Sequence, residues 1–119
     1  MRKLVDANVV LRYMLHDDEE QFLAAERAIR EGAHLLPEVL AEIVYVLQGV
    51  YSVPRAEIAS RLQILVDEVQ TEHPEALKSA LQIFGLNKLD FVDCLLVAYN
   101  NNLGDKVASF DRKLNRLLQ

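Results

Sequence analysis

Short apolar runs alternate with longer amphipathic segments along the whole chain, and this alternation constrains the fold most. The first two runs hold three or four residues each and end at Asp6 and at Pro37. Between the runs, apolar residues recur every three or four positions, which is the period of a helix with one buried face. Such alternation is typical of α/β proteins, in which helices cover both faces of a parallel sheet. We therefore expect an α/β fold with a small parallel β-sheet of about four to five strands flanked by helices.

The same pattern places the expected elements along the sequence. It predicts short strands at 3–5, 33–36 and 106–109, with a weaker indication at 68–70. It predicts helices at 7–15, 17–31, 38–49, from 54, 74–85, from 90 and from 111. Pro suits the first position of a helix, and Gly suits the residue that ends one. No linker, repeat or change of composition interrupts the chain, so we expect a single domain over residues 1–119.

Composition excludes several classes of protein. Hydrophobic residues make up 51% of the chain, with only 4 Gly and 3 Pro, which excludes disordered and collagen-like sequences. A single cysteine, Cys94, excludes an internal disulfide and a cysteine-based zinc site. The longest apolar run, 94–99, is far shorter than the ~20 residues that span a bilayer. We also find no signal-peptide pattern, and we expect a cytoplasmic protein that does not contact a membrane.

Acidic residues stand at the starts of several predicted helices. Asp6 follows the first strand, Asp111 follows the last, and Asp90 and Asp93 open a helix. Because sites in parallel sheets form at the carboxyl edge of the strands, we expect these acids to gather there. Each also has a plainer interpretation as a helix cap or a first-turn charge. Glu42 is different, since it lies in the middle of a predicted helix on a narrow polar stripe, where the plainer interpretation is a solvated helix face.

Four motifs resemble, in order, those of PIN-domain ribonucleases. Val5-Asp6-Ala7-Asn8 resembles the opening Asp-x-Asn of that family, and 39–47 resembles its helix with the second acid. The segment 89–98 resembles the one with the third acid, and 108–114 resembles the Thr/Ser-x-Asp ending. The resemblance covers nearly the whole chain and is nearest to the VapC-type toxins of toxin–antitoxin pairs. It implies a PIN-like fold and a metal-dependent endoribonuclease.

The resemblance also assigns roles to individual residues. The catalytic, metal-binding acids are Asp6, Glu42, Asp93 and Asp111, and the supporting residues are Asn8, Ser109 and Asp90. Mg²⁺ or Mn²⁺ suits such a set because both prefer oxygen ligands, neutralise phosphate charge and lower the pKa of bound water. The net charge of −5 is unusual for a protein that binds nucleic acid. Setting those four acids aside from the 18 acidic residues leaves 14 against 13 basic ones, so the rest of the chain is nearly neutral.

Basic residues near these acids are candidates for contacts to RNA phosphates. They are Arg12, Arg112, Lys113 and Arg116. Basic residues on an exposed helix are more often only solvated, which is the plainer interpretation. The resemblance further implies an RNA substrate, a small antitoxin protein as partner, and a homodimer. The many large apolar residues at 9–14 and 45–53 agree with such an interface, because one helix face buries only about half of its circumference.

Two other functions fit part of the pattern. A response-regulator receiver has a similar length and acids after its first strand, but it needs a phospho-accepting Asp near the middle of the chain. Residues 48–60 contain no Asp, and the last predicted strand leads to Ser109 and Asp111 rather than to Lys. A non-catalytic interaction module with the same fold is the second alternative, and only the complete set of four acids argues against it.

Overall fold

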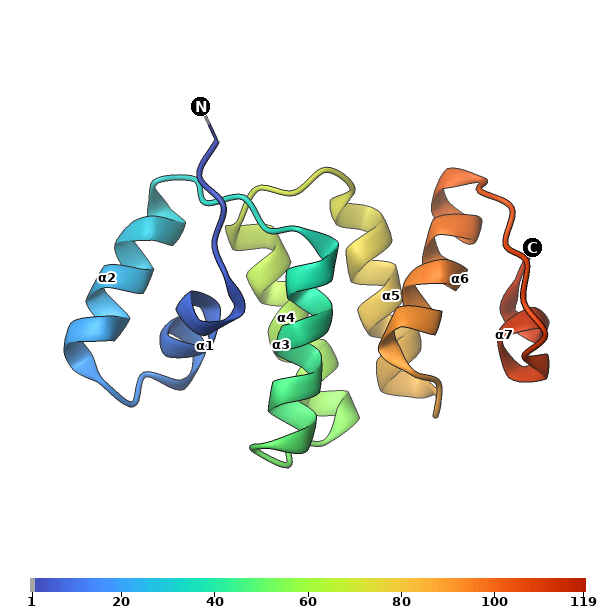
Figure 1. The fold of residues 1–119 in the computed structure, drawn as a ribbon, viewed down its shortest axis with the longest axis horizontal. Coiled ribbons are helices and arrows are strands. Elements are labelled where there is room, and N and C mark those ends of the chain that lie inside the picture. Colours follow the sequence, from blue (N-terminus) through green and yellow to red (C-terminus); the bar gives the residue numbers. More distant parts are fainter. Residues whose placement is uncertain (1) are drawn as a thin grey trace.

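The computed structural model describes residues 2–119, and these residues form seven helices (Figure 1). The helices are α1 (Ala7–Leu15), α2 (Glu19–Arg30), α3 (Pro37–Gly49), α4 (Arg55–Glu68), α5 (Pro74–Leu86), α6 (Phe91–Leu103) and α7 (Arg112–Leu117). Each lies where the apolar period predicts one, with bounds shifted by one or two residues at most of the ends. None of the helices within residues 2–119 has the length and apolar character needed to cross a membrane.

Side-chain caps explain where four of these helices begin. Asp6, Asp18, Asp90 and Asp111 each precede a helix and accept a hydrogen bond from a backbone N–H of its first turn. Such a cap satisfies one of the N–H groups that have no partner inside the helix. Helices α3 and α5 instead begin with Pro at their first position, where the missing N–H costs nothing.

The helices pack side by side into a flat molecule of 45 × 34 × 18 Å. Helix α1 packs on α2 and α3, α4 on α5, and α5 on α6, while α3 also touches α4 and α6. Helices α2 and α7 therefore lie at opposite ends of the molecule (Figure 1). The core between the helices is apolar, and no polar or charged residue among those described is buried in it. Its largest fully buried side chains are Phe84, Phe91, Leu35, Leu40, Ile43, Ile58, Leu62, Leu65, Leu77, Leu81, Leu114 and Val10.

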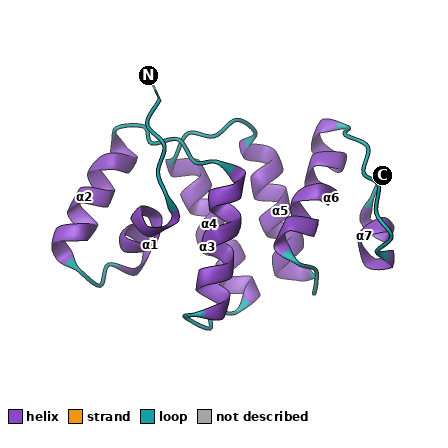
Figure 2. Cartoon of the chain, viewed as in Figure 1, coloured by secondary structure: helices purple, strands orange, loops and turns teal. Residues whose placement is uncertain are grey.

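The expected parallel β-sheet of about four to five strands is wrong. Residues 2–119 contain two isolated parallel bridges, Leu4 with His34 and His34 with Gln70, and no sheet (Figure 2). Backbone bonds of 2.7–3.2 Å join these three short segments in the order that a parallel sheet would have. The chain is therefore helical, with three predicted strand segments lying side by side in extended form.

The lengths of the segments explain why a sheet does not develop. Asp6 caps α1 directly after the first segment, and Pro37 begins α3 directly after the second. Pairing therefore stops after one bridge, well short of the ~5–6 residues of an ordinary strand. The fourth segment, 106–109, forms no bridge, because it lies beside α7 at the far end of the molecule (Figure 1).

Gly85 marks a close approach between α5 and α4, and it gives the first prediction. A Cβ atom at Gly85 would lie 2.8 Å from the Cβ of Ala59, whereas nothing lies within 4 Å of a Cβ at Gly49 on α3. We expect Gly85→Ala to lower the free energy of unfolding by up to about 2 kcal/mol, because overpacking outweighs the gain in helix propensity. Gly49→Ala is expected to raise it by about 0.4–1 kcal/mol. Denaturant unfolding of both variants checks this, and equal effects would contradict the close approach.

Candidate functional site

Two of the predicted acids lie at the start of α6. Asp90 is its N-cap and accepts a hydrogen bond from the backbone N–H of Val92 at 3.3 Å. Asp93 lies three residues after Asp90, in the first turn of α6, and its side chain is partly buried. The helix starts here because the backbone of Asp90 is not helical (φ −58°, ψ 145°) and its side chain is short enough to reach the first turn.

The carboxyl group of Asp93 is affected by burial and by two neighbouring acids. Burial raises the pKa of its carboxyl group, and the neighbouring charges of Asp90 and Asp111 raise it further. Like charges disfavour the ionised form of a carboxylate, which is the physical cause of these two smaller contributions. None of the three forms an ion pair with a cation within residues 2–119. The convergence of Asp93 and Asp111 on one site stays a prediction, and the charges of Asp90 and Asp111 act on Asp93 only through its raised pKa.

Asp111 is held at the start of α7 by a small network. Its Oδ1 accepts the backbone N–H of Leu114 at 3.0 Å, and its own N–H donates to Ser109 Oγ at 3.0 Å. Asn115 Nδ2 in turn donates to the carbonyl of Ser109 at 2.9 Å. Ser109 thus positions the backbone of Asp111 rather than its carboxylate. The contact that Ser109 makes with Asp111 is therefore a hydrogen bond to its backbone, and the predicted supporting role of Ser109 stays a prediction.

Glu42 lies on the face of α3 that turns toward α6. Tyr45, one turn further along α3, donates from its hydroxyl to Asp90 Oδ2 at 2.9 Å. Burial and this hydrogen bond raise the pKa of the Tyr45 hydroxyl. Residues three apart on a helix share a face, so Glu42, which is exposed, lies on the same stripe as Tyr45. In the sequence, Tyr45 counts among the apolar residues of a possible interface, and its bond to Asp90 is not predicted because that partner lies 45 positions away.

Asp6 and Asn8 lie apart from the other predicted residues. Asp6 Oδ1 accepts the backbone N–H of Val9 at 2.9 Å and so caps α1. Both side chains are exposed, and within residues 2–119 neither forms a side-chain hydrogen bond with the acids of α6 or α7. In this structure Asp6 therefore caps α1, and its predicted role as a metal ligand stays a prediction.

The four acids of the predicted metal site are therefore not gathered at one point. No three Asp, Glu, His or Cys side chains among the described residues lie close enough to hold one metal ion. The donor chemistry is suitable, since carboxylate oxygens are the ligands that Mg²⁺ and Mn²⁺ prefer. The placement of the side chains does not fit a single metal centre, so we derive no reaction step through a metal.

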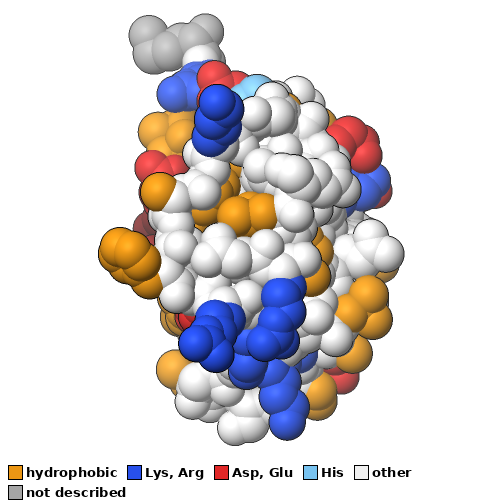
Figure 3. All heavy atoms as spheres, turned by 90° about the vertical axis from the view of Figure 1, so that its right-hand side faces the viewer, with side chains coloured by type: hydrophobic (Ala, Val, Ile, Leu, Met, Phe, Trp, Pro, Cys, Tyr) orange, Lys and Arg blue, Asp and Glu red, His pale blue; other side chains and the backbone are white. Residues whose placement is uncertain are grey.

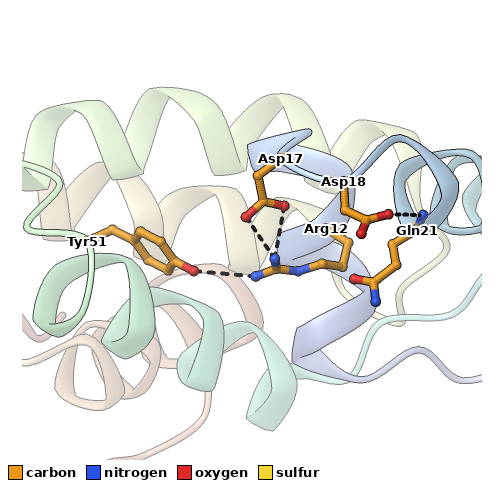
Figure 4. A network of polar contacts seen from close by, with 5 residues as sticks. All are labelled: Arg12, Asp17, Asp18, Gln21 and Tyr51. Carbon is orange, nitrogen blue, oxygen red and sulfur yellow. Dashed lines mark hydrogen bonds and ion pairs between the residues drawn. The ribbon is translucent and has the colours of Figure 1, made fainter.

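Arg12 is already paired within the protein (Figure 4). Its Nη1 donates to both carboxylate oxygens of Asp17 at 2.9 and 2.8 Å, and its Nη2 donates to the hydroxyl of Tyr51 at 3.3 Å. Hydrogen bonds to a carboxylate are stronger than neutral ones, and together with the bond to Tyr51 they hold the guanidinium in place. An RNA phosphate would therefore have to compete with Asp17 for the guanidinium of Arg12.

The basic residues of α7 are not neutralised in this way. Arg112, Lys113 and Arg116 make no ion pair within the described part of the chain. Lys and Arg side chains gather on the lower part of the face that carries α7 (Figure 3). Lys88, which the sequence did not single out, joins Lys113 and Arg116 around one hollow of the surface.

Arg55 supports the segment that leads to Asp90. Its guanidinium donates to the carbonyl of Phe84 at 3.0 Å and to the carbonyl of Leu89, and it lies 3.8 Å from the centre of the Phe84 ring. These bonds tie the start of α4 to the end of α5 and to the residue before Asp90. No signal in the sequence identifies Arg55, because all of its partners are distant along the chain.

The surroundings of Cys94 make its thiol unreactive. It is fully buried in the core beside Asp93, and burial raises the pKa of its thiol to about 12. A thiol of this kind is protonated at neutral pH and is a poor nucleophile. The expectation that Cys94 is packed rather than reactive is confirmed.

Comparison with known proteins gives one match. The family model described as PIN domain matches residues 3–117. No individual curated protein and no solved structure matches the chain. The match includes every acid and every basic residue described above.

Proposed function

The chain belongs to the PIN domain family, whose model matches residues 3–117, and from this we propose that it is an endoribonuclease that requires Mg²⁺ or Mn²⁺. PIN domains are generally nucleases that use divalent metal ions. The family therefore supports a hydrolase of nucleic acid. The choice of RNA, the cut within the strand and the choice of metal are our proposal.

The observation that carries this proposal is the position of Asp93 beside Asp90 and Asp111. Burial and the charges of Asp90 and Asp111 raise the pKa of Asp93, and within residues 2–119 none of the three carboxylates pairs with a cation. Such an arrangement costs the fold stability, and divalent cations relieve that cost when they bind. We propose that Asp93 and Asp111 contribute to metal binding, whereas the roles of Glu42 and Asp6 stay predictions, because the described side chains do not form one metal centre.

A non-catalytic module remains the second candidate, for one specific reason. Asp6, Asp90 and Asp111 each cap a helix, so capping alone is enough to explain three of the acids. Asp93 and Glu42 do not cap a helix. The two functions therefore differ most clearly in what Asp93 does, and variants of that residue separate them.

We also propose that the protein is the toxin of a toxin–antitoxin pair and forms a homodimer. Large apolar side chains support an interface, since Val50 is 71% and Tyr51 41% exposed at the end of α3. A second feature is a hollow of about 340 Å³ lined by Tyr13 of α1, Phe22 of α2 and Ile64 of α4. Apolar hollows between helices suit a short helix or extended segment of a small protein partner.

The test of the proposed function is cleavage of labelled single-stranded RNA by the purified chain. We expect cleavage with Mn²⁺ or Mg²⁺, none with EDTA, and recovery when Mn²⁺ is restored in excess. Mn²⁺ should also raise the melting temperature, because a ligand that binds only the folded state stabilises it. Unchanged cleavage in EDTA would contradict the metal requirement. No cleavage with either metal, together with no change in melting temperature, would favour the non-catalytic module.

A further inference from the structure

A basic hollow lies where the segment before α6 crosses α7. Its volume is about 260 Å³, and its charged lining residues are Lys88, Lys113 and Arg116. Leu89 and Leu117 supply apolar walls. Since one water occupies ~30 Å³ in the liquid, the hollow has room for a group of many atoms, such as a phosphate with its sugar.

The positive charge of this basic hollow is not neutralised by the protein. No Asp or Glu lines it, and none of its three cations pairs with a carboxylate within residues 2–119. This is notable in a chain whose net charge is −5. Three cations around one hollow form a site for an anion, and the guanidinium fork of Arg116 matches the oxygens of a phosphate.

The basic hollow adjoins the acids of the proposed site. Lys88 precedes Asp90 by two residues, and Lys113 follows Asp111 by two residues. Two residues of extended chain span at most about 7 Å. The two crossing segments therefore each carry one acid and one cation, and the cations of both segments meet in the hollow.

We propose that the basic hollow binds a backbone phosphate of single-stranded RNA, next to the bond that is cut. This rests on the proposed function, which places the cut at Asp93 and Asp111. Phe110, the residue before Asp111, favours a single strand because its ring is fully exposed, at 106%. Surfaces that bind single strands combine cations for the backbone with exposed aromatic rings on which bases stack.

The test measures RNA binding by fluorescence anisotropy, in a chain that carries Asp93→Asn so that the RNA stays intact. The variants Lys88→Gln, Lys113→Gln and Arg116→Gln each remove one charge from the basic hollow. The matched controls Lys3→Gln and Arg27→Gln remove the same charge at the N-terminal segment and on α2. We expect each hollow variant to bind a labelled single-stranded RNA several-fold more weakly and each control to bind like the parent. The slope of log affinity against log salt should become shallower by about 0.7 for each phosphate contact that is lost.

Four outcomes separate this inference from the proposed function. Equal weakening by hollow variants and controls would overturn the site, since the binding would then be unspecific. Hollow variants that bind RNA like the parent but no longer bind poly-glutamate would also overturn it, in favour of an acidic protein segment. If RNA is cut by the chain with Asp93 intact and the hollow variants cut equally well, the site fails and the nuclease stands. If no RNA is cut yet the hollow variants alone bind it weakly, the site stands and the nuclease fails.

Discussion

Asp93→Asn is expected to lower the rate of RNA cleavage at least about 100-fold while the fold is retained. Removing a residue that only supports a metal ligand already costs about 10–100-fold in activity, so loss of a proposed ligand costs more. The measurement is cleavage of labelled RNA with Mn²⁺, together with circular dichroism of the variant. Asp105→Asn is the matched control, because Asp105 is exposed after the end of α6 and should cut RNA at the parent rate.

The same variant gives an independent result on stability. Burial and the charges of Asp90 and Asp111 raise the pKa of Asp93 in the folded state. The ionised carboxylate therefore costs stability at any pH above that folded-state pKa, and the cost disappears as the pH falls below the pKa of the unfolded chain. At neutral pH and without metal, Asp93→Asn should melt at the same temperature as the parent or higher. A lower melting temperature would mean that Asp93 stabilises the start of α6 as a simple first-turn charge.

The toxin proposal predicts that the chain slows the growth of cells that express it. Expression of the parent chain should arrest growth, and expression of Asp93→Asn at the same level should not. If the well-expressed parent is harmless, the toxin proposal is lost but the nuclease proposal is still tested by RNA cleavage. If Asp93→Asn arrests growth as strongly as the parent, cleavage at this site is not the cause.

The helices were predictable because their signals are local. A helix needs an apolar period within its own residues and a cap within one turn of its start, and both are visible in the sequence at Asp18, Asp90 and Asp111. Pro37 and Pro74 start helices for the same local reason. The positions of the helices therefore follow from the sequence to within one or two residues at most of the ends.

The sheet was wrong because pairing between strands is not a local property. The short runs at 3–5 and 33–36 have the composition of strands, but their lengths leave room for one bridged residue each, Leu4 and His34. Leu4 is 52% exposed, so its burial does not drive a sheet to form. Composition of a run favours an extended backbone, whereas a sheet depends on how many residues of each run find a partner.

The candidate site was predictable only in part, for a similar reason. Acids beside helix starts are visible along the chain, and the charge of Asp111 contributes to the raised pKa of Asp93. Tyr45, Arg55 and Lys88 act across 45, 34 and about 25 positions, so no spacing in the sequence links them to the acids. Convergence of Asp6 and Glu42 on the same point was inferred from an edge of a sheet, and without the sheet that inference loses its geometric basis.

Phe84→Ala is expected to give the largest loss of stability, about 3–5 kcal/mol in the free energy of unfolding. Phe84 is 1% exposed, its ring packs edge-to-face on Phe91 with centres 5.7 Å apart, and the guanidinium of Arg55 lies over it at 3.8 Å. The substitution therefore creates a cavity and removes an aromatic and a cation–π contact together. Since small domains are stable by only about 5–15 kcal/mol, this is a large share of the total.

Phe110→Ala is the matched control, because the same change is made to a ring that is fully exposed. It should alter the free energy of unfolding by less than about 0.5 kcal/mol. Denaturant unfolding measures both variants, and Phe84→Leu supplies a milder change if Phe84→Ala does not fold. Equal losses for the two alanine variants would contradict the burial of Phe84 between α4, α5 and α6. A loss of stability in the Phe84 variant alone would show that packing around this ring stabilises the fold. The same packing holds Arg55 over the ring, and Arg55 binds the carbonyl of Leu89, the residue before Asp90.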